Sequence, residues 1–385
     1  MRFPEFSGEW GKSTLQSVAT VSKGAGISKD QLSEEGQPCI LYGELYTKYN
    51  SEIIDTIISK TDIDSEKLVR SQANDVIIPC SGESAVDIAT ARCVKQSNVL
   101  LGGDLNIISL KGEHDGSFFA YQLNGRRKYD IAKVAQGVSV VHLYGEHLKR
   151  VKVNYPSATE QKKISSLLAL IDQRIETQRK IIEKYESLIR GISNKLLYES
   201  EGASACLGDI LIERSERTKI NNQHEVLSST VKGIFSQREY FSKDIASENN
   251  VGYKIIRLHD VVLSPQNLWM GNINYNDKFD IGIVSPSYKI FSIADGYDKR
   301  FVAGLLKTHR ALYNYMQVSE QGASIVRRNL NIEAFEQLVF KMPPLYKQQK
   351  IGNAIFVLNS RLGVANRIKL DLELQKDWLL REMFI

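Results

Sequence analysis

The sequence predicts a chain of mixed α/β (α+β) class, in which two similar domains are each followed by one long helix. Three observations support this prediction. A stretch near the middle of the chain is repeated at its end, an apolar rhythm typical of long paired helices runs through both copies, and short β-branched segments fill the residues before each copy. At 385 residues the chain is long enough for two or three domains with hydrophobic cores.

The repeat is clearest between residues 155–189 and residues 343–375. Placing Pro156 on Pro343 gives an offset of 187 residues. The same offset pairs further residues without a gap: Gln161 with Gln348, Lys163 with Lys350, Ile164 with Ile351, and Arg174 with Arg361. Because identical residues recur in the same order, the two stretches indicate one structural element that is used twice.

Both copies share an apolar rhythm in which steps of four and three residues alternate. This spacing keeps side chains on one seam of a helix with an effective repeat of 3.5 residues, which is typical of helices that pair along their length. We therefore predict two helices that pair with each other through Ile164, Leu168, Ile171, Ile175, Ile351, Ile355, Leu358 and Leu362. The alternative is that each helix packs only on its own domain, and the seam alone does not exclude it.

The repeat extends into the residues before each helix. The stretch 135–156 aligns with 320–344, so that Gln136 is paired with Gln321 and Ser139 with Ser324. The chain therefore reads as domain, helix, domain, helix. Its predicted parts are a first domain over 1–155, a helix over 156–199, a second domain over 200–342 and a helix over 343–385.

The residues of each domain predict strands with a few short helices. Apolar segments there are short and β-branched, such as "DVIIP" at 75–79, "LNIISL" at 105–110 and "IGIVS" at 281–285, and Gly, Asn, Asp and Ser separate them. Helical patterns follow at 116–135 and 299–317. Each domain is therefore expected to combine strands and helices.

Composition excludes several classes of protein. The four cysteines are scattered without a C-x-x-C or a nearby His pair, so the sequence predicts neither a disulfide framework nor a metal site. No apolar run reaches the length of a signal peptide core or the roughly 18 residues of a membrane span, so a cytoplasmic location is expected. The formal charge of +5 permits nucleic-acid binding without pointing to a purely electrostatic binder.

The usual motifs of catalysis are missing from the sequence, so no catalytic residue is predicted. It contains no G-x-x-x-x-G-K-[ST], no H-E-x-x-H and no G-x-S-x-G. The stretch "KGAGIS" at 23–28 has two glycines but lacks the third glycine and the acidic residue of a dinucleotide site.

One stretch keeps an enzyme alternative open. "SPSY" at 285–288 is similar to the [DNS]-P-P-[YF] motif with which amino-methyltransferases hold an extruded base. Ser287 stands in place of the second proline, and no glycine-rich loop for a methyl donor lies upstream. A turn that ends a strand is the favoured interpretation, and a self-sufficient DNA amino-methyltransferase is the alternative.

Polar clusters at the predicted strand ends contain the residue types that reach DNA bases and phosphates. Gln and Asn can pair with adenine, Arg with guanine and Glu with cytosine, while Lys, Ser, Thr and Tyr serve phosphates or bases. The candidates in the first domain are Tyr42, Glu44, Tyr46, Thr47, Lys48, Ser81, Glu83, Ser84, Gln136 and Ser139. Those in the second domain are Ser229, Thr230, Lys232, Gln266, Asn267, Gln321, Ser324, Arg327 and Arg328. The alternative for any one cluster is a half-buried strand or a solvated edge.

The doubled plan resembles a known family. A proline followed by [EK]-Q-x-K-I and a long amphipathic helix occurs twice behind similar domains, as in the specificity (S) subunit of Type I restriction-modification systems. "MRFPEFSGEW", "LYGELYTKY" and "LSPQNLWMGNI" also look like stretches of that family. The resemblance covers the whole chain. The second helix departs from the first in having Lys347 where the first has Glu160, and Lys376 where the first has apolar residues nearby.

The resemblance implies a role in reading DNA. The two domains would be target-recognition domains that each read one half of a split, asymmetric site in double-stranded DNA, and the helices would form an antiparallel coiled coil that sets the gap between the halves. Two methyltransferase (modification) subunits would dock on the helices and methylate adenine N6 with S-adenosylmethionine. Restriction/translocase subunits would add cleavage with ATP and Mg. This chain would bind no cofactor itself, and a scaffold protein without a nucleic-acid role is the remaining alternative.

Overall fold

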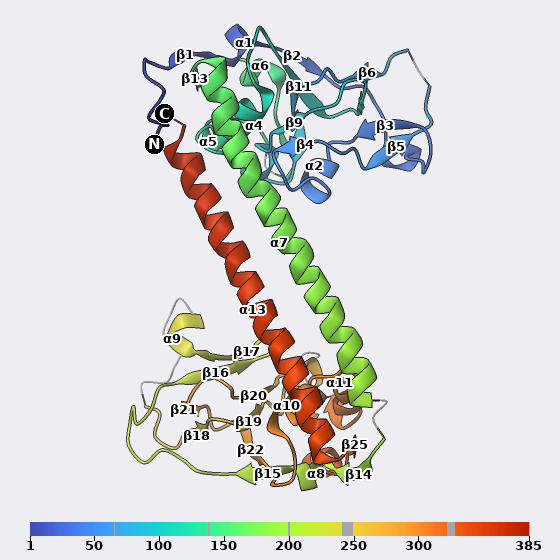
Figure 1. Cartoon of the computed structure of the whole chain (residues 1–385), viewed down its shortest axis with the longest axis vertical. Helices are drawn as coiled ribbons and strands as arrows, with labels where there is room; N and C mark the ends of the chain where they lie inside the picture. Colours follow the sequence, from blue (N-terminus) through green and yellow to red (C-terminus); the bar gives the residue numbers. More distant parts are fainter. Residues whose placement is uncertain (65, 138, 199–200, 241–248, 322–327, 385) are drawn as a thin grey trace. The chain divides into compact units, whose positions relative to one another are not determined.

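The computed structural model describes residues 1–64, 66–137, 139–198, 201–240, 249–321 and 328–384 (Figure 1). Contacts divide the chain into two compact units: unit 1 contains Met1–Lys180 and Asn366–Ile385, and unit 2 contains Ile181–Ala365. Each unit combines β-sheets with helices, which confirms the predicted mixed α/β class. The limits of the four predicted parts stay a prediction.

Unit 1 is built on a five-stranded sheet in the order β2-β11-β7-β9-β4. Its strands are β2 (Ala19–Lys23), β11 (Leu105–Leu110), β7 (Asp75–Pro79), β9 (Arg92–Val94) and β4 (Ile53–Ile54), antiparallel except for the parallel pair β4 and β9. The central strand β7 is buried throughout because alternate residues pack on opposite faces: Val76 and Ile78 join one hydrophobic cluster and Ile77 joins another.

Smaller elements surround this sheet. The other strands of unit 1 are β1 (Gly11–Thr14) with β13 (Lys152–Tyr155), β8 (Ser81–Gly82) with β12 (Val141–His142), and the sheet of β5 (Ser59–Thr61), β3 (Gln37–Ile40), β10 (Leu100–Leu101) and β6 (Val69–Arg70). The short helices are α1 (Leu15–Val18), η1 (Lys29–Gln31), α2 (Glu44–Thr47), α3 (Ala85–Ile88), α4 (Gly116–Asn124), α5 (Lys128–Val134) and α6 (Gly145–Leu148).

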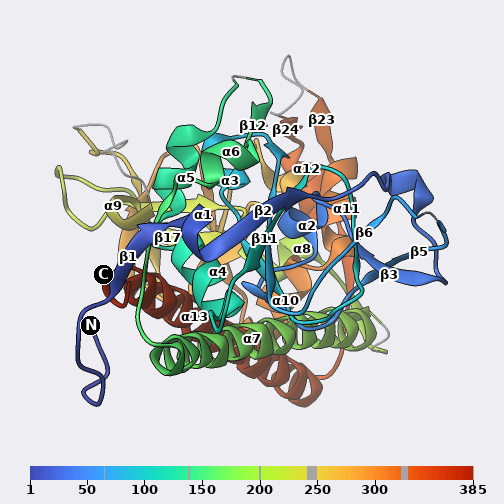
Figure 2. The same cartoon turned by 90° about the horizontal axis from the view of Figure 1, so that it is seen from above.

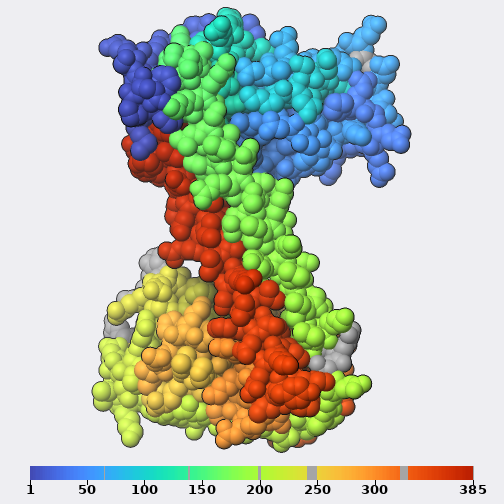
Figure 3. Space-filling view, viewed as in Figure 1, coloured from blue at the N-terminus to red at the C-terminus, as the bar shows by residue number. Residues whose placement is uncertain are grey.

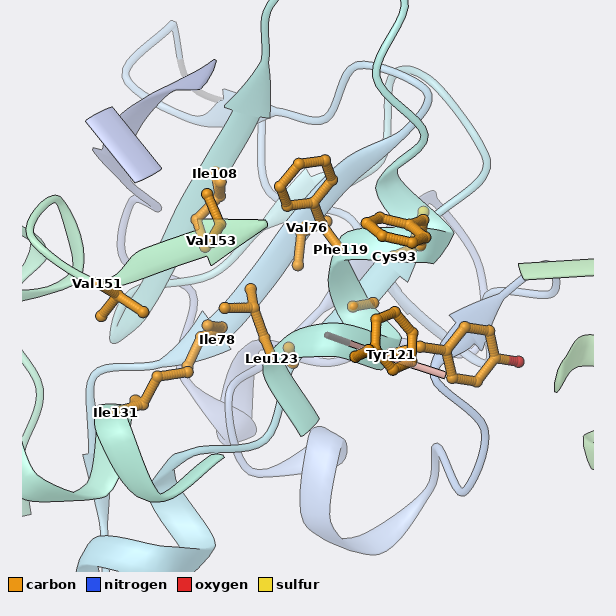
Figure 4. Packing of buried hydrophobic residues seen from close by; sticks show 14 of the residues in the cluster. Val76, Ile78, Cys93, Ile108, Phe119, Tyr121, Leu123, Ile131, Val151 and Val153 are labelled. Atoms are coloured by element: carbon orange, nitrogen blue, oxygen red, sulfur yellow. The ribbon is translucent and has the colours of Figure 1, made fainter. Parts of the chain in front are cut away.

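Helix α4 joins the sheet of unit 1 to the long helix α7 (Ala158–Tyr198) (Figure 2). Phe118, Phe119 and Leu123 are completely buried in the cluster that contains Val76 and Ile78. Figure 4 shows the ring of Phe119 and the side chain of Leu123 among these strand residues. Other parts of unit 1 cover α4 on nearly all sides, which explains why its residues are mostly apolar.

Unit 2 contains a four-stranded sheet and several strand pairs. The sheet is β15 (Leu211–Arg214), β22 (Lys289–Ile293), β19 (Val261–Leu263) and β20 (Ile273–Tyr275), in that order. The pairs are β14 (Ala203–Cys206) with β25 (Val339–Met342), β16 (Leu227–Thr230) with β17 (Gly233–Ser236), β18 (Lys254–Arg257) with β21 (Ile281–Val284), and β23 (Ser319–Gln321) with β24 (Arg328–Leu330). The short helices are α8 (Leu207–Ile210), α9 (Gln237–Tyr240), η2 (Leu268–Met270), α10 (Lys299–Leu306), α11 (His309–Gln317) and α12 (Ile332–Glu336).

Two long helices, α7 with 41 residues and α13 (Leu345–Glu382) with 38, have parts in both units. In unit 1 the first part of α7 and the last part of α13 share a core, in which Ile164 and Leu168 lie with Met383. In unit 2 the last part of α7 and the first part of α13 share a core, in which Leu197 lies with Ile355. The two helices therefore run antiparallel, and each packs on a domain as well as with the other helix.

The repeated glutamine of the first helix holds α4 in place. Gln161 Oε1 accepts a hydrogen bond from the backbone N–H of Asp115 over 3.0 Å, and Gln161 Nε2 donates to the carbonyl of Pro156 over 2.9 Å. Asp115 is the N-cap of α4, because its carboxylate accepts from the N–H of Ser117. Gln161 is 1% exposed, so this amide joins the entry of α7 to the start of α4 inside the protein.

The second copy repeats this arrangement in unit 2. Gln348 Oε1 accepts from the N–H of Asp298 over 2.9 Å, and Gln348 Nε2 donates to the carbonyl of Pro343 over 2.7 Å. Asp298 is the N-cap of α10, where its carboxylate accepts from the N–H of Phe301. Figure 3 shows the red atoms of α13 against the orange atoms of unit 2. The repeat in the sequence thus encodes the same joint twice, and α4 and α10 are equivalent helices.

Candidate nucleic-acid interface

Three of the predicted clusters in the first domain come together on one surface of unit 1. The hydroxyl of Tyr46 in α2 donates to the carbonyl of Ser81 in β8 over 3.2 Å. β8 pairs with β12, and Ser81 Oγ lies 3.2 Å from Nδ1 of His142. The backbone of His142 in turn forms a bridge with Gln136. The segments 42–48 and 81–84, with residues 136–137 and 139–142, therefore form one continuous patch, which we call the unit 1 patch.

The exposed side chains of the unit 1 patch are aromatic and polar. Tyr42 and Tyr46 are exposed although both are large and hydrophobic. Burial of the Tyr46 hydroxyl, with a contribution from Asp87, raises its pKa well above the ordinary value, so this group stays a neutral donor. Thr47, Glu83, Gln136 and Ser139 are also exposed, and Ser81 is half-buried. Such a mixture of rings, hydroxyls and amides suits contacts with both bases and phosphates.

Ser84 has a local role in the unit 1 patch. Its hydroxyl caps α3 by accepting from the N–H of Asp87 over 3.1 Å, and it donates to the Asp87 carboxylate over 2.6 Å. Ser84 therefore sets the direction of the loop that carries Glu83.

Glu44 was predicted to contact a base, and the structure corrects this. Its carboxylate is 5% exposed and accepts from the N–H of Leu41 over 3.0 Å, from Nζ of Lys48 over 2.7 Å and from the hydroxyl of Ser59. Lys48 Nζ also donates to Ser59 Oγ over 2.6 Å. These bonds hold α2 against β5, so Glu44 is a structural residue whose acceptors are used inside the protein.

In unit 2 the predicted residues of the β16–β17 hairpin divide into buried and exposed. Ser229 is 2% exposed, and its hydroxyl bonds to the side chains of Asn272 and Asn274 over 2.9 and 2.7 Å. It therefore supports the hairpin and does not contact a base as predicted. Thr230 closes the turn by bonding to the carbonyl of Gly233, and Lys232 is exposed at the tip.

A second group of predicted residues in unit 2 surrounds η2. The backbone N–H of Arg328 donates to the carbonyl of Gln266 over 3.2 Å, which brings β24 beside the loop that carries exposed Gln266 and half-buried Asn267. The guanidinium of Arg328 lies 4.6 Å from the centre of the Trp269 ring. The backbone of Gln321 pairs with Arg328, while Ser324 and Arg327 lie outside the described residues.

Three functional candidates escaped prediction because nothing in their local sequence marks them. His142 is exposed in the unit 1 patch and Tyr144 is exposed next to it, with ring centres 6.4 Å apart. In unit 2, Lys307 Nζ donates to the carbonyls of Gly271 and Val231 over 2.9 and 3.5 Å, and so links the loop after η2 to the β16–β17 turn. These residues become recognisable only when the fold has brought distant segments together.

The predicted helix contacts lie partly in the domain cores. Ile164, Leu168 and Ile171 are buried in the core of unit 1, and Ile175 packs against it. Ile351 and Ile355 are buried in the core of unit 2. Leu358 and Leu362 lie farther along α13 and are half-buried.

The "SPSY" stretch forms a turn between β21 and β22. The N–H of Tyr288 donates to the carbonyl of Ser285 over 3.1 Å, which closes the turn. The hydroxyl of Tyr288 donates to the carbonyl of Ser229 over 2.9 Å, and burial raises its pKa. The stretch is therefore a turn that ends β21, as the favoured interpretation of the sequence predicts, and the ring is held against the hairpin.

The described part of the chain contains neither a metal site formed by clustered side chains nor a helix that could span a membrane. Within it, no group of His, Cys, Asp and Glu side chains has the arrangement of a metal site. None of the helices described here has the length and apolar character needed to cross a membrane.

Comparisons with known proteins agree with this arrangement. Residues 7–186 match the family model described as Type I restriction modification DNA specificity domain. The chain is similar to the crystal structure of the Type-I restriction-modification system S subunit from M. genitalium, with a TM-score of 0.66 and 17% identity, over 100% of this chain and 99% of that chain. It is also similar to a structure described as the structural basis underlying complex assembly and conformational transition of the type I R-M system, with a TM-score of 0.52 and 10% identity, over 98% and 97% of the two chains.

At these identities the solved structures show the fold, while the family model rests on the sequence itself. The sequence of residues 7–186 is therefore similar to Type I restriction-modification DNA specificity domains, and over its whole length the chain has a fold similar to that of the M. genitalium S subunit.

Proposed function

We propose that this chain reads a bipartite, asymmetric DNA site for a Type I restriction-modification complex and has no catalytic site of its own. The observation that carries the proposal is the unit 1 patch, where three segments distant in sequence place exposed Tyr, Thr, Gln and Ser side chains side by side within the matched family domain. Unit 2 offers a different set at the β16–β17 turn and around η2. Two equivalent domains with dissimilar polar surfaces suit two different half-sites.

The chemistry belongs to partner subunits in this proposal. Two methyltransferase subunits would dock on α7 and α13, bind S-adenosylmethionine and methylate adenine N6 in each half-site. Restriction/translocase subunits would add cleavage that depends on ATP and Mg. The structure described as complex assembly of a type I R-M system supports this proposal, because it has the same fold. All of these events would occur in the cytoplasm.

Substituting an exposed candidate side chain of one unit should weaken the recognition of only one half-site. We expect Gln266→Ala, in a complex reconstituted with methyltransferase subunits, to weaken binding to the preferred duplex by about 5- to 150-fold, because a good bidentate base contact is worth about 1–3 kcal/mol. Binding to unrelated DNA should stay the same. Lys341→Ala is the control, because Lys341 on β25 bonds to Ser204 on β14, away from the candidate residues. Affinity is measured by fluorescence anisotropy with duplexes selected from a random library, and failure of the wild-type complex to select any sequence would contradict the proposal.

The enzyme alternative has its own test. A self-sufficient methyltransferase has to bind the methyl donor, whereas a specificity subunit does not. Calorimetry of the isolated chain with S-adenosylmethionine should therefore show no stoichiometric heat. Clear one-to-one binding would favour the enzyme alternative.

A further inference from the structure

Unit 2 contains a cavity of about 460 Å³ that shares Lys232 with the candidate interface. Its walls come from the last part of α7, the first part of α13, the α10–α11 junction, the β16–β17 turn and the segment after β20. This volume lies in the range of sites that hold small ligands or parts of larger ones. All of its lining residues belong to unit 2.

The equivalent place in unit 1 is filled by side chains. There the Tyr121 hydroxyl donates to Oδ2 of Asp172 over 2.7 Å, and Nζ of Lys376 lies 2.6 Å from Oδ1 of the same carboxylate. Figure 4 shows the hydroxyl of Tyr121 directed away from the packed strand residues. Tyr121 is completely buried, so ring and ion pair together close this space.

The internal repeat places the cavity where unit 1 has this cluster. Counting from the equivalent caps Asp115 and Asp298, Tyr121 corresponds to Gly304. The offset of the long helices makes Asp172 correspond to Asn359 and Lys376 to Ile189. Gly304, Asn359 and Ile189 all line the cavity. The second copy has therefore lost the tyrosine ring and the ion pair that fill the first.

Packing does not require glycine at this position. A Cβ on Gly304 would meet Ile355 and Leu197 at 3.5 and 3.7 Å, which are ordinary contacts. Glycine inside a helix costs about 1 kcal/mol relative to alanine. Gly304 therefore keeps space open that a larger side chain would occupy.

The walls of the cavity are strongly cationic. Six basic side chains line it: Arg190, Lys232, Lys278, Arg300, Lys307 and His309. Asp277 is the only carboxylate among the lining residues. None of the six makes an ion pair with any residue that the structure describes. The charges of the five Arg and Lys side chains are therefore available to a ligand.

Uncharged groups hold three of these cations in position. The Arg300 guanidinium bonds to Oδ1 of Asn353 and lies 4.0 Å from the centre of the Phe356 ring. Lys307 Nζ donates to the carbonyl of Gly271, and Lys278 Nζ lies 5.5 Å from the Phe235 ring centre. Burial lowers the pKa of Lys307 to about 8. An anion in the cavity would favour the charged form of Lys307.

We propose that this cavity binds a phosphate group. Several Arg and Lys side chains directed at one space suit the charge and the many acceptor oxygens of a phosphate better than a single carboxylate. The phosphate could come from the backbone of bound DNA or from a free phosphorylated ligand. Lys232 belongs both to the cavity and to the candidate interface, which favours DNA. The assignment to DNA rests on the proposed function, whereas binding of a free phosphorylated ligand would not depend on it.

Two kinds of variant test the proposal. Gly304→Tyr fills the cavity with the side chain that unit 1 uses, and Gly304→Ala is its matched control because a Cβ fits without displacement. Arg300→Met with Lys307→Met removes two charges and keeps the cavity, with Lys341→Met as the control cation outside it. Circular dichroism checks that each variant is folded.

Two measurements distinguish the sources of the phosphate. Pyrophosphate is titrated into the full chain by calorimetry, and duplex DNA is titrated into the reconstituted complex at several salt concentrations. If the phosphate belongs to DNA, the double variant should reduce the slope of log K against log salt by about one for each lost phosphate contact, equally for all sequences. If it belongs to a free ligand, Gly304→Tyr and the double variant should weaken pyrophosphate binding at least tenfold, and the salt slope should not change.

Other outcomes would overturn the inference. Salt slopes and pyrophosphate affinities equal to those of the controls would show that the cavity binds no phosphate. Loss of methyltransferase docking with both phosphate measurements unchanged would instead assign the cavity to an acidic partner protein. If the wild-type complex selected no DNA sequence, the proposed function would fail, while the pyrophosphate titration would still decide the cavity.

Discussion

Replacing Lys376 by methionine should lower the free energy of unfolding of unit 1 by about 3–5 kcal/mol, because removing one partner of a buried ion pair leaves charge without compensation. Lys376 Nζ bonds to the carboxylates of Glu52 and Asp172, and the three side chains are 13%, 8% and 8% exposed. Methionine keeps the apolar length of lysine and removes only the charge. Denaturant unfolding with amide hydrogen exchange locates the loss in unit 1.

The loss in Lys376→Met should depend on pH. Although burial raises the pKa of Glu52, the charges of Lys376 and Arg92 lower it below its ordinary value of 4.5. Glu52 therefore contributes stability above about pH 4.5 that is lost as the pH falls through its lowered pKa. Burial and the charge of Glu52 raise the pKa of Asp172. As the pH falls, protonation of Asp172 therefore removes a buried negative charge that repels Glu52. The deficit of the variant should thus be largest at neutral pH and shrink on acidification.

At alkaline pH the stability of this site depends on the protonation of Lys376. Burial lowers its pKa, but Glu52 and Asp172 raise it overall above 10.5. A raised pKa means that its contribution is complete below pH 10.5 and is lost as the pH rises through the folded-state value. Adding Glu52→Gln and Asp172→Asn to Lys376→Met should restore most of the stability, because neutral groups then fill the site. A deficit of the same size at every pH and in the triple variant would contradict the ion-pair explanation.

Replacing Gln161 by alanine should leave two buried backbone groups without partners, the N–H of Asp115 and the carbonyl of Pro156. Each buried group without a partner costs about 1–3 kcal/mol, so we expect a loss of this order in unit 1. Gln348→Ala should cause a loss of similar size in unit 2, because it leaves the N–H of Asp298 and the carbonyl of Pro343 without their hydrogen-bond partner. Hydrogen exchange of α4 and α10 separates the two effects.

The matched control for these variants is Gln173→Ala, an exposed glutamine on the same helix α7. It should change the free energy of unfolding by less than about 0.5 kcal/mol, as surface substitutions usually do. Equal effects of all three substitutions would show that the repeated glutamines are not the joints described above.

The sequence predicted the long elements better than the contacts of single side chains. Periodicity over many residues identified α7 and α13, and the repeated Pro-to-Gln spacing placed the same joint in both units. Glu44 was assigned wrongly because its partners Lys48 and Ser59 meet it only when α2 folds against β5. Ser229 was assigned wrongly because Asn272 and Asn274, from a later segment of the chain, bond to it inside the protein.

The cavity of unit 2 could not be predicted from local patterns either. Its five Arg and Lys side chains come from four separate segments of the chain, and a single arginine or lysine in any of them looks like an ordinary surface residue. The exchange of Tyr121 for Gly304 becomes meaningful only when α4 and α10 are recognised as equivalent helices. Tertiary contacts therefore decide which polar residues serve the fold and which remain for binding.

The most direct test of the central claim is a map of adenine methylation on DNA exposed to a complex of this chain with the proposed methyltransferase subunits. The claim predicts methylated adenines in two defined sequence elements separated by a constant gap, and no methylation when this chain is omitted. Methylation that ignores sequence, or that needs only the partner subunits, would contradict the claim that this chain selects the DNA.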